Sequence, residues 1–215
     1  GAASAMPSVS SPADFVFTAN CPVRNETACM TLSQDKAVRV WFCNGSSWGS
    51  VTQICSDAGT NSTSPCAIAY ESLSGKLMMV YWTQGSGAIG WRTYNGTSTS
   101  SESRITMSGV HGVTYLSLAV NPSTNEMLLL ALTSNDKVQG AVWNGSSWTN
   151  ESKLDNNLIW SAGCCFAVAY AGVSSTAMAA YTIGNSWTPQ YHLWMGSSWS
   201  AAASAPAFGS KPHWV

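Results

Sequence analysis

The fold is predicted by the segment Val142-Trp143-Asn144-Gly145-Ser146-Ser147-Trp148, because close copies of it recur along the chain. The copies are Cys43-Asn44-Gly45-Ser46-Ser47-Trp48, Tyr94-Asn95-Gly96-Thr97 and Trp194-Met195-Gly196-Ser197-Ser198-Trp199, at steps of 51, 49 and 51 residues. The first and third repeats align at an offset of 100 residues, with Pro22 on Pro122 and Asn25-Glu26 on Asn125-Glu126. The sequence therefore predicts a unit of about 50 residues used four times.

Each repeat reads as four short strands. Apolar first strands are expected at 15–17, 67–70, 116–120 and 166–170, and second strands are clearest at 77–82 and 127–132. A third, alternating strand then leads through the Asn-Gly turn into a more polar fourth strand, such as 50–55 or 103–107. A tight hairpin turn needs positive φ at its centre, which Asn tolerates and Gly adopts freely. We expect the aromatic residues beside the turn to face one another across the hairpin.

This pattern predicts an all-β fold, a β-propeller-like array of four-stranded antiparallel blades. The expected blades span 13–63, 64–113, 114–162 and 163–209. Residues 1–15 repeat 201–215 at an offset of 200. Residues 1–12 are thus expected to form an outer strand of a preceding blade plus a linker, and 210–215 the start of a following blade. The chain is either a window cut from a longer array or a subunit whose end strands pair with other subunits.

The composition excludes several classes of partner. Charged residues make up only 9% of the chain, and nine basic and ten acidic residues are scattered along it, so no basic stripe is available for nucleic acid. No apolar run is long enough to span a membrane, and the first residues do not resemble a signal peptide. We expect no cofactor and no metal, because the cysteines form no Cys-x-x-Cys pair and no cluster with histidine.

Cysteines and acceptor sequons both favour an extracellular or cell-surface protein. The seven cysteines are interpreted as disulfide candidates, with small buried apolar residues as the alternative: Cys21, Cys29, Cys43, Cys55, Cys66, Cys164 and Cys165. Cys165 is placed at the repeat position of Cys66, on a first strand. Six Asn-x-Ser/Thr sequons in polar, turn-like segments are candidates for N-glycosylation: Asn25, Asn44, Asn61, Asn95, Asn144 and Asn150.

The order of an apolar strand, a short turn, a strand with Trp or Tyr and then Asn-Gly-x-x-Trp resembles the lectin-like β-propellers, including fucose-binding ones. The resemblance is architectural and spans nearly the whole chain. It implies an Arg and a Glu that grip the sugar in each blade. Arg39 and Arg92 have no counterpart in the third or fourth repeat, and no Glu recurs on the third strand. Fucose specificity is therefore not expected from these residues.

Sugar binding requires aromatic faces beside short polar groups, and aromatic residues do flank the Asn-Gly turns. The glycan-binding candidates are Trp48, Trp148, Trp199, Tyr94, Trp143 and Trp194. The alternative is that these rings clamp the hairpin and pack between blades. Which of the two roles they have depends on their exposure in the folded chain.

An enzyme is not expected. The Ser-x-Asp-x-Gly box of propeller sialidases is only half echoed at 33–37 and 134–138, and no recurrent pair of carboxylates suits glycoside hydrolysis. His111, His192 and His213 lie in unrelated positions without a nucleophile signature. The favoured hypothesis is a noncatalytic structural or assembly protein of a cell surface, appendage or filament that associates through its end strands. The alternative is a glycan-binding adhesion module.

Overall fold

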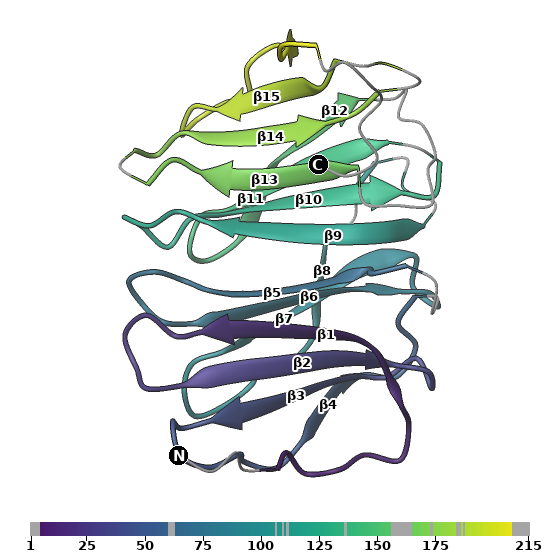
Figure 1. Ribbon diagram of the computed structural model, residues 1–215, viewed down its shortest axis with the longest axis vertical. Coiled ribbons are helices and arrows are strands. Elements are labelled where there is room, and N and C mark those ends of the chain that lie inside the picture. Colours follow the sequence, from purple (N-terminus) through teal and green to yellow (C-terminus); the bar gives the residue numbers. More distant parts are fainter. Residues whose placement is uncertain are drawn as a thin grey trace. The chain divides into compact units, whose positions relative to one another are not determined.

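The computed structural model describes residues 5–59, 63–105, 107–108, 110, 112–135, 137–155, 165–172, 174–183, 186 and 188–207. In this part of the chain the secondary structure consists of strands, arranged in four antiparallel sheets of four strands each (Figure 1). The chain divides into two compact units, Gly1–Thr106 and Met107–Val215, and each unit contains two sheets. The expected all-β architecture of four-stranded blades is confirmed.

Each sheet follows the chain order, so every blade is a meander. Blade 1 contains β1 (Ala13–Asn20), β2 (Thr27–Ser33), β3 (Val38–Cys43) and β4 (Thr52–Cys55), and blade 2 contains β5 (Cys66–Tyr70), β6 (Leu77–Thr83), β7 (Ala88–Tyr94) and β8 (Ser103–Ile105). Blade 3 contains β9 (Val113–Val120), β10 (Met127–Thr133), β11 (Val138–Trp143) and β12 (Trp148–Asp155). Blade 4 contains β13 (Phe166–Tyr170), β14 (Ala177–Tyr181), β15 (Gln190–Trp194) and β16 (Ala203–Ser204).

In blades 2 and 3 the second strand is buried along its whole length. Every residue of β6 and of β10 is buried, which explains why these segments read as continuous apolar runs instead of alternating ones. A strand with both faces covered needs apolar side chains at every position. The outer strands β4 and β12 keep exposed polar positions, as their sequences predict.

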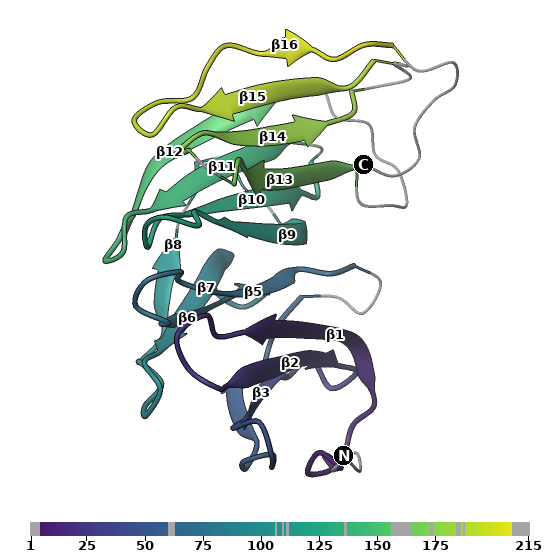
Figure 2. The same cartoon turned by 60° about the vertical axis from the view of Figure 1, so that its left-hand side comes forward.

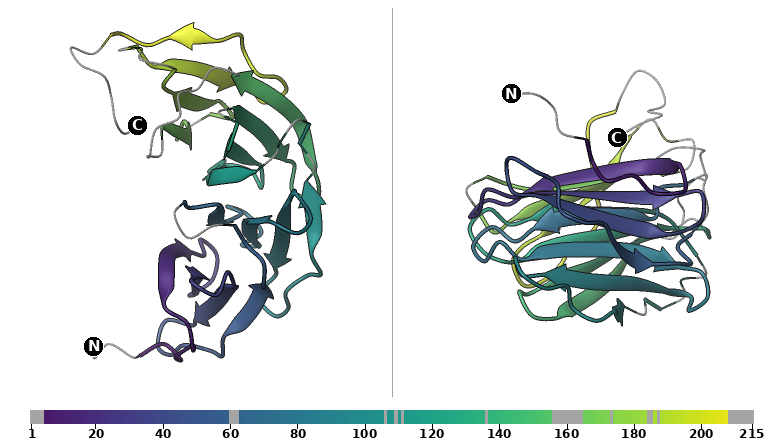
Figure 3. Two further views of the ribbon diagram at one scale, coloured as in Figure 1. Left: turned by 90° about the vertical axis from the view of Figure 1, so that its right-hand side faces the viewer. Right: turned by 90° about the horizontal axis from the view of Figure 1, so that it is seen from below.

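The two blades of each unit pack face to face. In the first unit, alternate residues of β2 and β3 meet alternate residues of β5 and β6, with Met30, Leu32, Val40, Met79 and Tyr81 fully or almost fully buried. β1 runs beside β5 in the first unit, and β9 runs beside β13 in the second (Figure 2). In the second unit Leu130 and Leu132 of blade 3 pack with Phe166 and Tyr181 of blade 4. Each sheet is twisted, as Figure 3 shows, and this is the normal geometry of antiparallel strands.

Strands were expected from the sequence at both ends of the chain. Residues 5–12 are not in a strand, but they lie against blade 1: Trp41 Nε1 donates to Pro7 O at 3.2 Å and Gln34 N donates to Pro12 O at 3.0 Å. Residues 210–215, the expected start of a following blade, lie outside the described residues. No helix long and apolar enough to cross a membrane occurs in the part of the chain that the structure describes.

The register corrects one repeat assignment. Cys66 pairs with Tyr81, and Phe166 pairs with Tyr181, so Phe166 and not Cys165 stands at the position of Cys66. Cys165 takes the place of Pro65, because Thr182 N donates to Cys165 O as Trp82 N donates to Pro65 O. Matching Cys165 to Cys66 because both are cysteines moves the alignment one residue away from the offset of 100, at which Phe166 falls on Cys66.

The cysteines of the first unit are free thiols in the structure: Cys21, Cys29, Cys43, Cys55 and Cys66. All except Cys43 are buried. Cys164 lies outside the described residues, and Cys165 is 4% exposed. This arrangement favours the alternative that cysteines of the first unit serve as small buried apolar side chains.

Candidate functional site

The Asn-Gly hairpins form as expected, but with different roles for the two residues. Asn144 Oδ1 accepts hydrogen bonds from Ser146 N at 3.0 Å and from Ser147 N at 2.9 Å, and Asn44 and Asn95 make the same contacts in their blades. Only the glycine takes a positive φ, for example 94° at Gly145. The expectation that Asn itself adopts positive φ is therefore wrong: its side chain closes the turn by hydrogen bonding instead.

Aromatic residues face one another across two of the hairpins, as predicted. The Trp143 and Trp148 ring centroids are 5.6 Å apart, and those of Trp194 and Trp199 are 5.5 Å apart, both in tilted arrangements. Trp143 is 2% exposed and Trp194 is 1% exposed. These two candidates are therefore core residues that cannot offer a face to a sugar.

The other hairpin tryptophans are half-buried, and the structure shows what one of them covers. A Cβ atom on Gly140 of blade 3 would lie 2.9 Å from Trp199 Cζ2, so Trp199 of blade 4 packs directly on the backbone of blade 3. The indole nitrogens of Trp148 and Trp199 are both shielded from solvent. Trp48 pairs with Cys43 across its hairpin. For Trp199 the geometry supports the role of packing between blades.

Tyr94 joins the two blades of the first unit. Its ring stacks on Phe42 of blade 1, with centroids 3.9 Å apart and an interplanar angle of 23°, and both rings are half-buried. Burial raises the pKa of Tyr94. The position is thus partly structural and partly accessible.

One carboxylate in each unit binds two blades together, a contact that is absent from the expectations drawn from the sequence. Glu26 of blade 1 accepts a hydrogen bond from Tyr70 of blade 2 at 2.7 Å, and Glu126 accepts one from Tyr170 at 2.8 Å. Glu126 also accepts from Trp194 Nε1 at 2.9 Å. Burial, followed by the hydrogen bond to the carboxylate, raises the pKa of both tyrosines. This Glu–Tyr contact could have been predicted, because the Glu and the Tyr both recur in the sequence at an offset of 100 residues.

In the first unit this contact carries an arginine as well. Arg24 NH2 lies 2.9 Å from Glu26 Oε1 and 2.8 Å from Gly75 O of blade 2. The Arg24 and Glu26 side chains are 31% and 13% exposed. Thr124 replaces the arginine in the second unit. Arg24 and Glu26 therefore serve mainly as a structural contact between blades 1 and 2, to which they direct hydrogen bonds.

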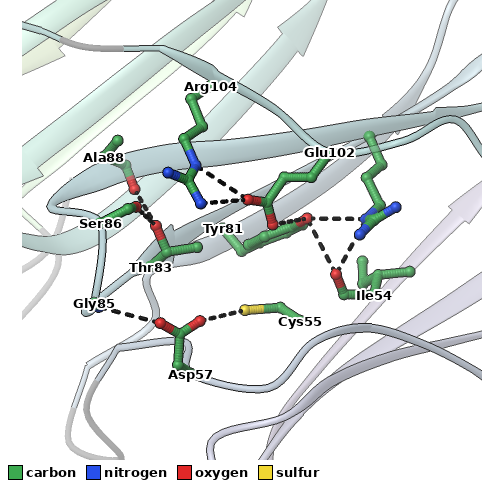
Figure 4. A network of polar contacts seen from close by, with 11 residues as sticks. Ile54, Cys55, Asp57, Tyr81, Thr83, Gly85, Ser86, Ala88, Glu102 and Arg104 are labelled. Atoms are coloured by element: carbon green, nitrogen blue, oxygen red, sulfur yellow. Dashed lines mark hydrogen bonds and ion pairs between the residues drawn. The ribbon is translucent and has the colours of Figure 1, made fainter.

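A second polar group is more accessible; we call Tyr81, Arg92, Glu102 and Arg104 the Glu102 cluster (Figure 4). Arg104 Nε and NH2 each lie 3.1 Å from Glu102 Oε1, and Glu102 Oε2 lies 3.1 Å from the Tyr81 hydroxyl. Arg92 Nε lies 3.2 Å from the same hydroxyl and 3.1 Å from Ile54 O of blade 1. The Arg104 side chain is 55% exposed and that of Glu102 is 22% exposed.

The strand register explains why these side chains meet. Arg104 of β8 pairs with Gly90 of β7, which pairs with Tyr81 of β6, so the three positions lie in one row across blade 2. Side chains in such a row project from the same face of the sheet. Gly90 is required there, because a Cβ on it would lie 2.6 Å from Tyr81 Cε2. Burial raises the pKa of Tyr81, so the hydroxyl stays protonated.

Loop contacts fix the edge of the cluster. Asp57 Oδ2 accepts from Gly85 N at 3.1 Å, and Cys55 Sγ donates to Asp57 Oδ1 at 3.4 Å (Figure 4). These bonds hold the segment after β4 against the β6–β7 turn of blade 2. These contacts therefore hold Ile54 O in place, and this oxygen accepts a hydrogen bond from Arg92 Nε.

Part of the Glu102 cluster recurs in the sequence. Glu102-Ser103-Arg104 follows the turn of blade 2 at the same distance as Glu151-Ser152-Lys153 follows the turn of blade 3. The register agrees, because Arg104 pairs with Gly90 and Lys153 with Gln139, each five residues before its turn Asn. The resemblance to the lectins implies a Glu on the third strand, whereas this Glu precedes or lies on the fourth strand. Blade 3 has Ala141 where blade 2 has Arg92.

Arg39 has a local role. It forms a bidentate pair with Asp35 of the β2–β3 turn, and this hydrogen-bonded pair lowers the pKa of Asp35. Arg39 is 9% exposed. It therefore differs from Arg104 in having its guanidinium both buried and committed to a neighbour on the same hairpin.

The histidines and the glycosylation sequons are the remaining candidates from the sequence. His192 is 8% exposed on β15, whereas His111 and His213 lie outside the described residues. Among the sequons, Asn25, Asn44, Asn95, Asn144 and Asn150 are exposed, and Asn61 lies outside the described residues. Within the described residues, no group of His, Cys, Asp and Glu is arranged to hold a metal ion.

No protein-family model and no curated protein sequence matches this chain. Solved structures do match. BP39L lectin from Burkholderia pseudomallei has a TM-score of 0.65 at 13% identity, covering 91% of this chain and 57% of that chain. SapL1 lectin, solved in complex with alpha methyl fucoside, has a TM-score of 0.60 at 15% identity, covering 94% of this chain and 65% of that chain.

The six-bladed β-propeller lectin of Aleuria aurantia, whose structure describes a fucose recognition mode, has a TM-score of 0.52 at 14% identity. That match covers 89% of this chain and 60% of the lectin, so the chain spans about three-fifths of the length of these lectins. NanB sialidase from Streptococcus pneumoniae also matches, with a TM-score of 0.50 over 26% of its length. At these identities the likeness establishes the fold alone, and the resemblance to the lectin-like β-propellers is confirmed at that level.

Proposed function

We propose that the protein is a noncatalytic glycan-binding module, and that the Glu102 cluster together with Tyr94 forms a sugar site on blade 2. The observation that carries this proposal is the exposed guanidinium–carboxylate pair of Arg104 and Glu102, fixed by Tyr81. A sugar hydroxyl both donates and accepts, so a carboxylate beside a guanidinium can bind two neighbouring hydroxyl groups. Because the pair is already oriented, little ordering is needed when a ligand binds.

Tyr94 supplies the aromatic part of this site. It lies two residues after Arg92 on β7, and side chains two apart on a strand share a face. The ring is half-buried and is held by Phe42 at 3.9 Å. An aromatic ring with one fixed orientation can pack against the apolar face of a pyranose. Among the six aromatic candidates from the sequence, Tyr94 is the one that lies on a strand of blade 2.

The structural neighbours support a glycan over the other partners. BP39L, SapL1 and the Aleuria aurantia protein are lectins, and SapL1 binds alpha methyl fucoside. We therefore propose a hexopyranose with adjacent free hydroxyl groups as the ligand class, with methyl fucoside as the first sugar to test. The structural or filament hypothesis receives no support from these neighbours, and the glycan-binding alternative takes its place.

A noncatalytic role fits the chemistry of the cluster. Glycoside hydrolysis requires a protonated carboxylic acid beside a second carboxylate. Glu102 is the single carboxylate of the Glu102 cluster, and it is paired with the Arg104 guanidinium at 3.1 Å. We also propose an extracellular or cell-surface location, supported by five exposed sequons and by the lectin neighbours.

The experiment is a glycan array followed by calorimetric titration of the best sugar. Glu102→Gln and Arg104→Ala should each weaken binding about tenfold or more, which corresponds to the loss of a charge-assisted hydrogen bond. Lys153→Ala is the matched control: it removes the exposed cation at the equivalent position of blade 3, where no arginine corresponds to Arg92. It should leave the affinity unchanged.

Folding is checked by circular dichroism before each titration. Arg104 is exposed, and an exposed ion pair contributes about 0–1 kcal/mol, so the variants should fold. Two results count against the proposal: no signal on the array from folded protein, or a sugar that binds equally well to the wild type and to both blade 2 variants.

A further inference from the structure

The sheet of blade 4 has one face packed against blade 3 and an opposite face that is open. On the packed face, Phe166, Ala179 and Tyr181 meet Leu130 and Leu132 of blade 3. Residues directly opposite one another on paired strands share a face, so the strand register identifies the open face as well. We call two cross-strand rows the open face of blade 4: Ala169, Met178 and Leu193 in one row, and Ala167, Ala180, Tyr191 and Ala203 in the other.

The open face of blade 4 is apolar and accessible. None of its seven residues is buried, and none carries a charge. Met178 at its centre is 45% exposed, and Met195, two residues after Leu193, is 58% exposed. A monomeric soluble protein rarely leaves a continuous apolar patch of more than a few hundred Å² in contact with water. This face is therefore a candidate for contact with another protein surface.

The repeat shows what this side of a blade does elsewhere in the chain. Leu128 and Leu130 of blade 3 stand 50 residues before Met178 and Ala180. Both leucines are 0% exposed, because they pack against blade 4. The same side of blade 1 packs against blade 2. In each unit this side of the first blade thus receives a second blade, and in blade 4 the equivalent side is open.

Blade 1 of a second copy does not offer a free surface for this face. The side of blade 1 turned away from blade 2 carries Arg39 and Trp41, which are 9% and 2% exposed. Residues 5–12 lie against it, with Trp41 Nε1 donating to Pro7 O at 3.2 Å. Docking there would require this segment to leave. The open face of blade 4 on a second copy requires no such rearrangement.

We propose that the open face of blade 4 is a dimer interface, and that it binds the same face of a second copy of this chain. A two-fold axis then brings identical patches together, as two packed sheets. Because the face carries no charge, identical residues meet without repulsion. The contact joins faces of sheets, whereas the sequence led us to expect pairing between end strands. It goes beyond the proposed sugar site and does not depend on sugar binding.

The size of the open face predicts a weak dimer. Four strands about 4.8 Å apart, with about five residues in each longer strand, offer on the order of 500 Å² of accessible surface on each copy. The total of about 1,000 Å² is at the lower end of the range for specific interfaces. We therefore expect a dissociation constant on the order of 10 µM, so that monomer and dimer exchange.

The first test is sedimentation equilibrium of the wild type from roughly 1 to 300 µM, a range that brackets the expected dissociation constant. The mean mass should rise with concentration from 22.7 kDa towards twice that value and then level off, because an isologous contact closes at two copies. The dimer should persist in about 1 M NaCl, since salt screens charges and not apolar contacts. A monomer at every concentration, a dimer dissociated by salt, or growth beyond two copies overturns the proposal.

The second test repeats this measurement on Met178→Glu and Ala169→Glu. Both residues are exposed, so both variants should fold, which circular dichroism checks. Each should raise the dissociation constant at least about tenfold, because dimerisation would bury a carboxylate. Val16→Glu is the matched control: it adds the same charge at a strand position of blade 1 that is 62% exposed. It should leave the dissociation constant unchanged.

Two results with these variants overturn the proposal. If the open-face variants dimerise as tightly as the wild type, the dimer uses another surface. If Val16→Glu weakens the dimer as much as Met178→Glu does, blade 1 of one copy meets blade 4 of the other, and the contact is not isologous.

Discussion

At the scale of single residues, polar groups at the blade junctions fix the alignment of neighbouring blades, which the hydrophobic core alone does not fix. Apolar packing is tolerant of small shifts, whereas a hydrogen bond between buried groups requires one arrangement. Tyr70 with Glu26 and Tyr170 with Glu126 fix how two neighbouring blades are aligned in each unit. The Arg92 and His192 contacts fix the same blades farther along their third strands.

The cysteines give a prediction at this scale. Burial raises the pKa of Cys55 to about 12, so at pH 8 the thiol is almost wholly protonated and unreactive. Cys43 is half-buried on the last position of β3. In native protein treated with iodoacetamide at pH 8, peptide mass spectrometry should find Cys43 modified well before Cys55 and Cys66.

The sign of the pH effect follows from the same burial. Raising the pH from 7 to 9 should leave Cys55 nearly unmodified, because burial raises its pKa to about 12. A urea-unfolded sample, in which all thiols react, is the control. Finding Cys55 or Cys66 in a disulfide in freshly purified protein would show that the thiol assignment is wrong.

At the scale of elements, the hairpin between the third and fourth strands is the most regular part of the repeat. Three blades close it with an Asn side chain, and blade 4 keeps the same backbone turn with Met195, whose N donates to Ser198 O at 3.0 Å. Gly196 retains a positive φ of 81° there. The glycine is thus needed for the backbone conformation, while the Asn adds stability to a turn that forms without it.

A glycine inside a strand gives the second prediction. Gly90 of β7 lies under the Tyr81 ring, and a Cβ there would be 2.6 Å from Tyr81 Cε2. Tyr81 is fully buried, so it cannot move away without disturbing the core. Gly90→Ala should lower the free energy of unfolding by about 1–3 kcal/mol, the usual range for overpacking.

The measurement is urea denaturation followed by tryptophan fluorescence. Gly172→Ala is the matched control, since a Cβ on Gly172 has no atom within 4 Å and its φ is not in the left-handed region. It should change stability by less than about 0.5 kcal/mol. Equal stability of the wild type and the Gly90 variant would mean that the Tyr81 ring lies elsewhere, and with it the Glu102 cluster.

At the scale of the whole molecule, a low and balanced charge limits the kinds of partner. Nine basic and ten acidic residues leave a formal net charge of −1, and several of the arginines are paired with nearby carboxylates. Binding to a polyanion depends on a surplus of positive charge in one region. Recognition by this protein should therefore rest on short hydrogen bonds and packing.

The corresponding prediction concerns nucleic acids and other polyanions. On a phosphocellulose column at pH 7.5 and low salt, on the order of 50 mM, the protein should pass through unretained. Lysozyme, a strongly basic protein, serves as the retained control on the same column. Retention that is released by increasing salt would reveal a basic surface in residues that the sequence pattern did not group.

Local features of this protein follow from its sequence, whereas features that depend on distant segments do not. The repeat, its four strands and the paired rings of Trp143 with Trp148 were all predictable, because strand alternation and turn chemistry depend on neighbouring residues. The burial of Trp194 was not predictable, because it depends on packing against Leu128 and Val142 of the preceding blade 3. Two residues of the Glu102 cluster, Glu102 and Arg104, could be noticed in the sequence as the repeated Glu-Ser-Arg/Lys. Only the strand register shows that Arg104 lies in one row with Tyr81.

The repeat that begins with Val142-Trp143-Asn144-Gly145 thus determined the fold class by itself: a period of about 50 residues with four turn-bounded strands permits few architectures. Tertiary structure decided which polar residues serve the fold and which face solvent. Arg39 and Arg104 look alike in sequence, yet one is buried against Asp35 and the other is 55% exposed beside Glu102. The physical reason is that exposure is a property of packing between segments, and no local pattern records which segment will cover a side chain.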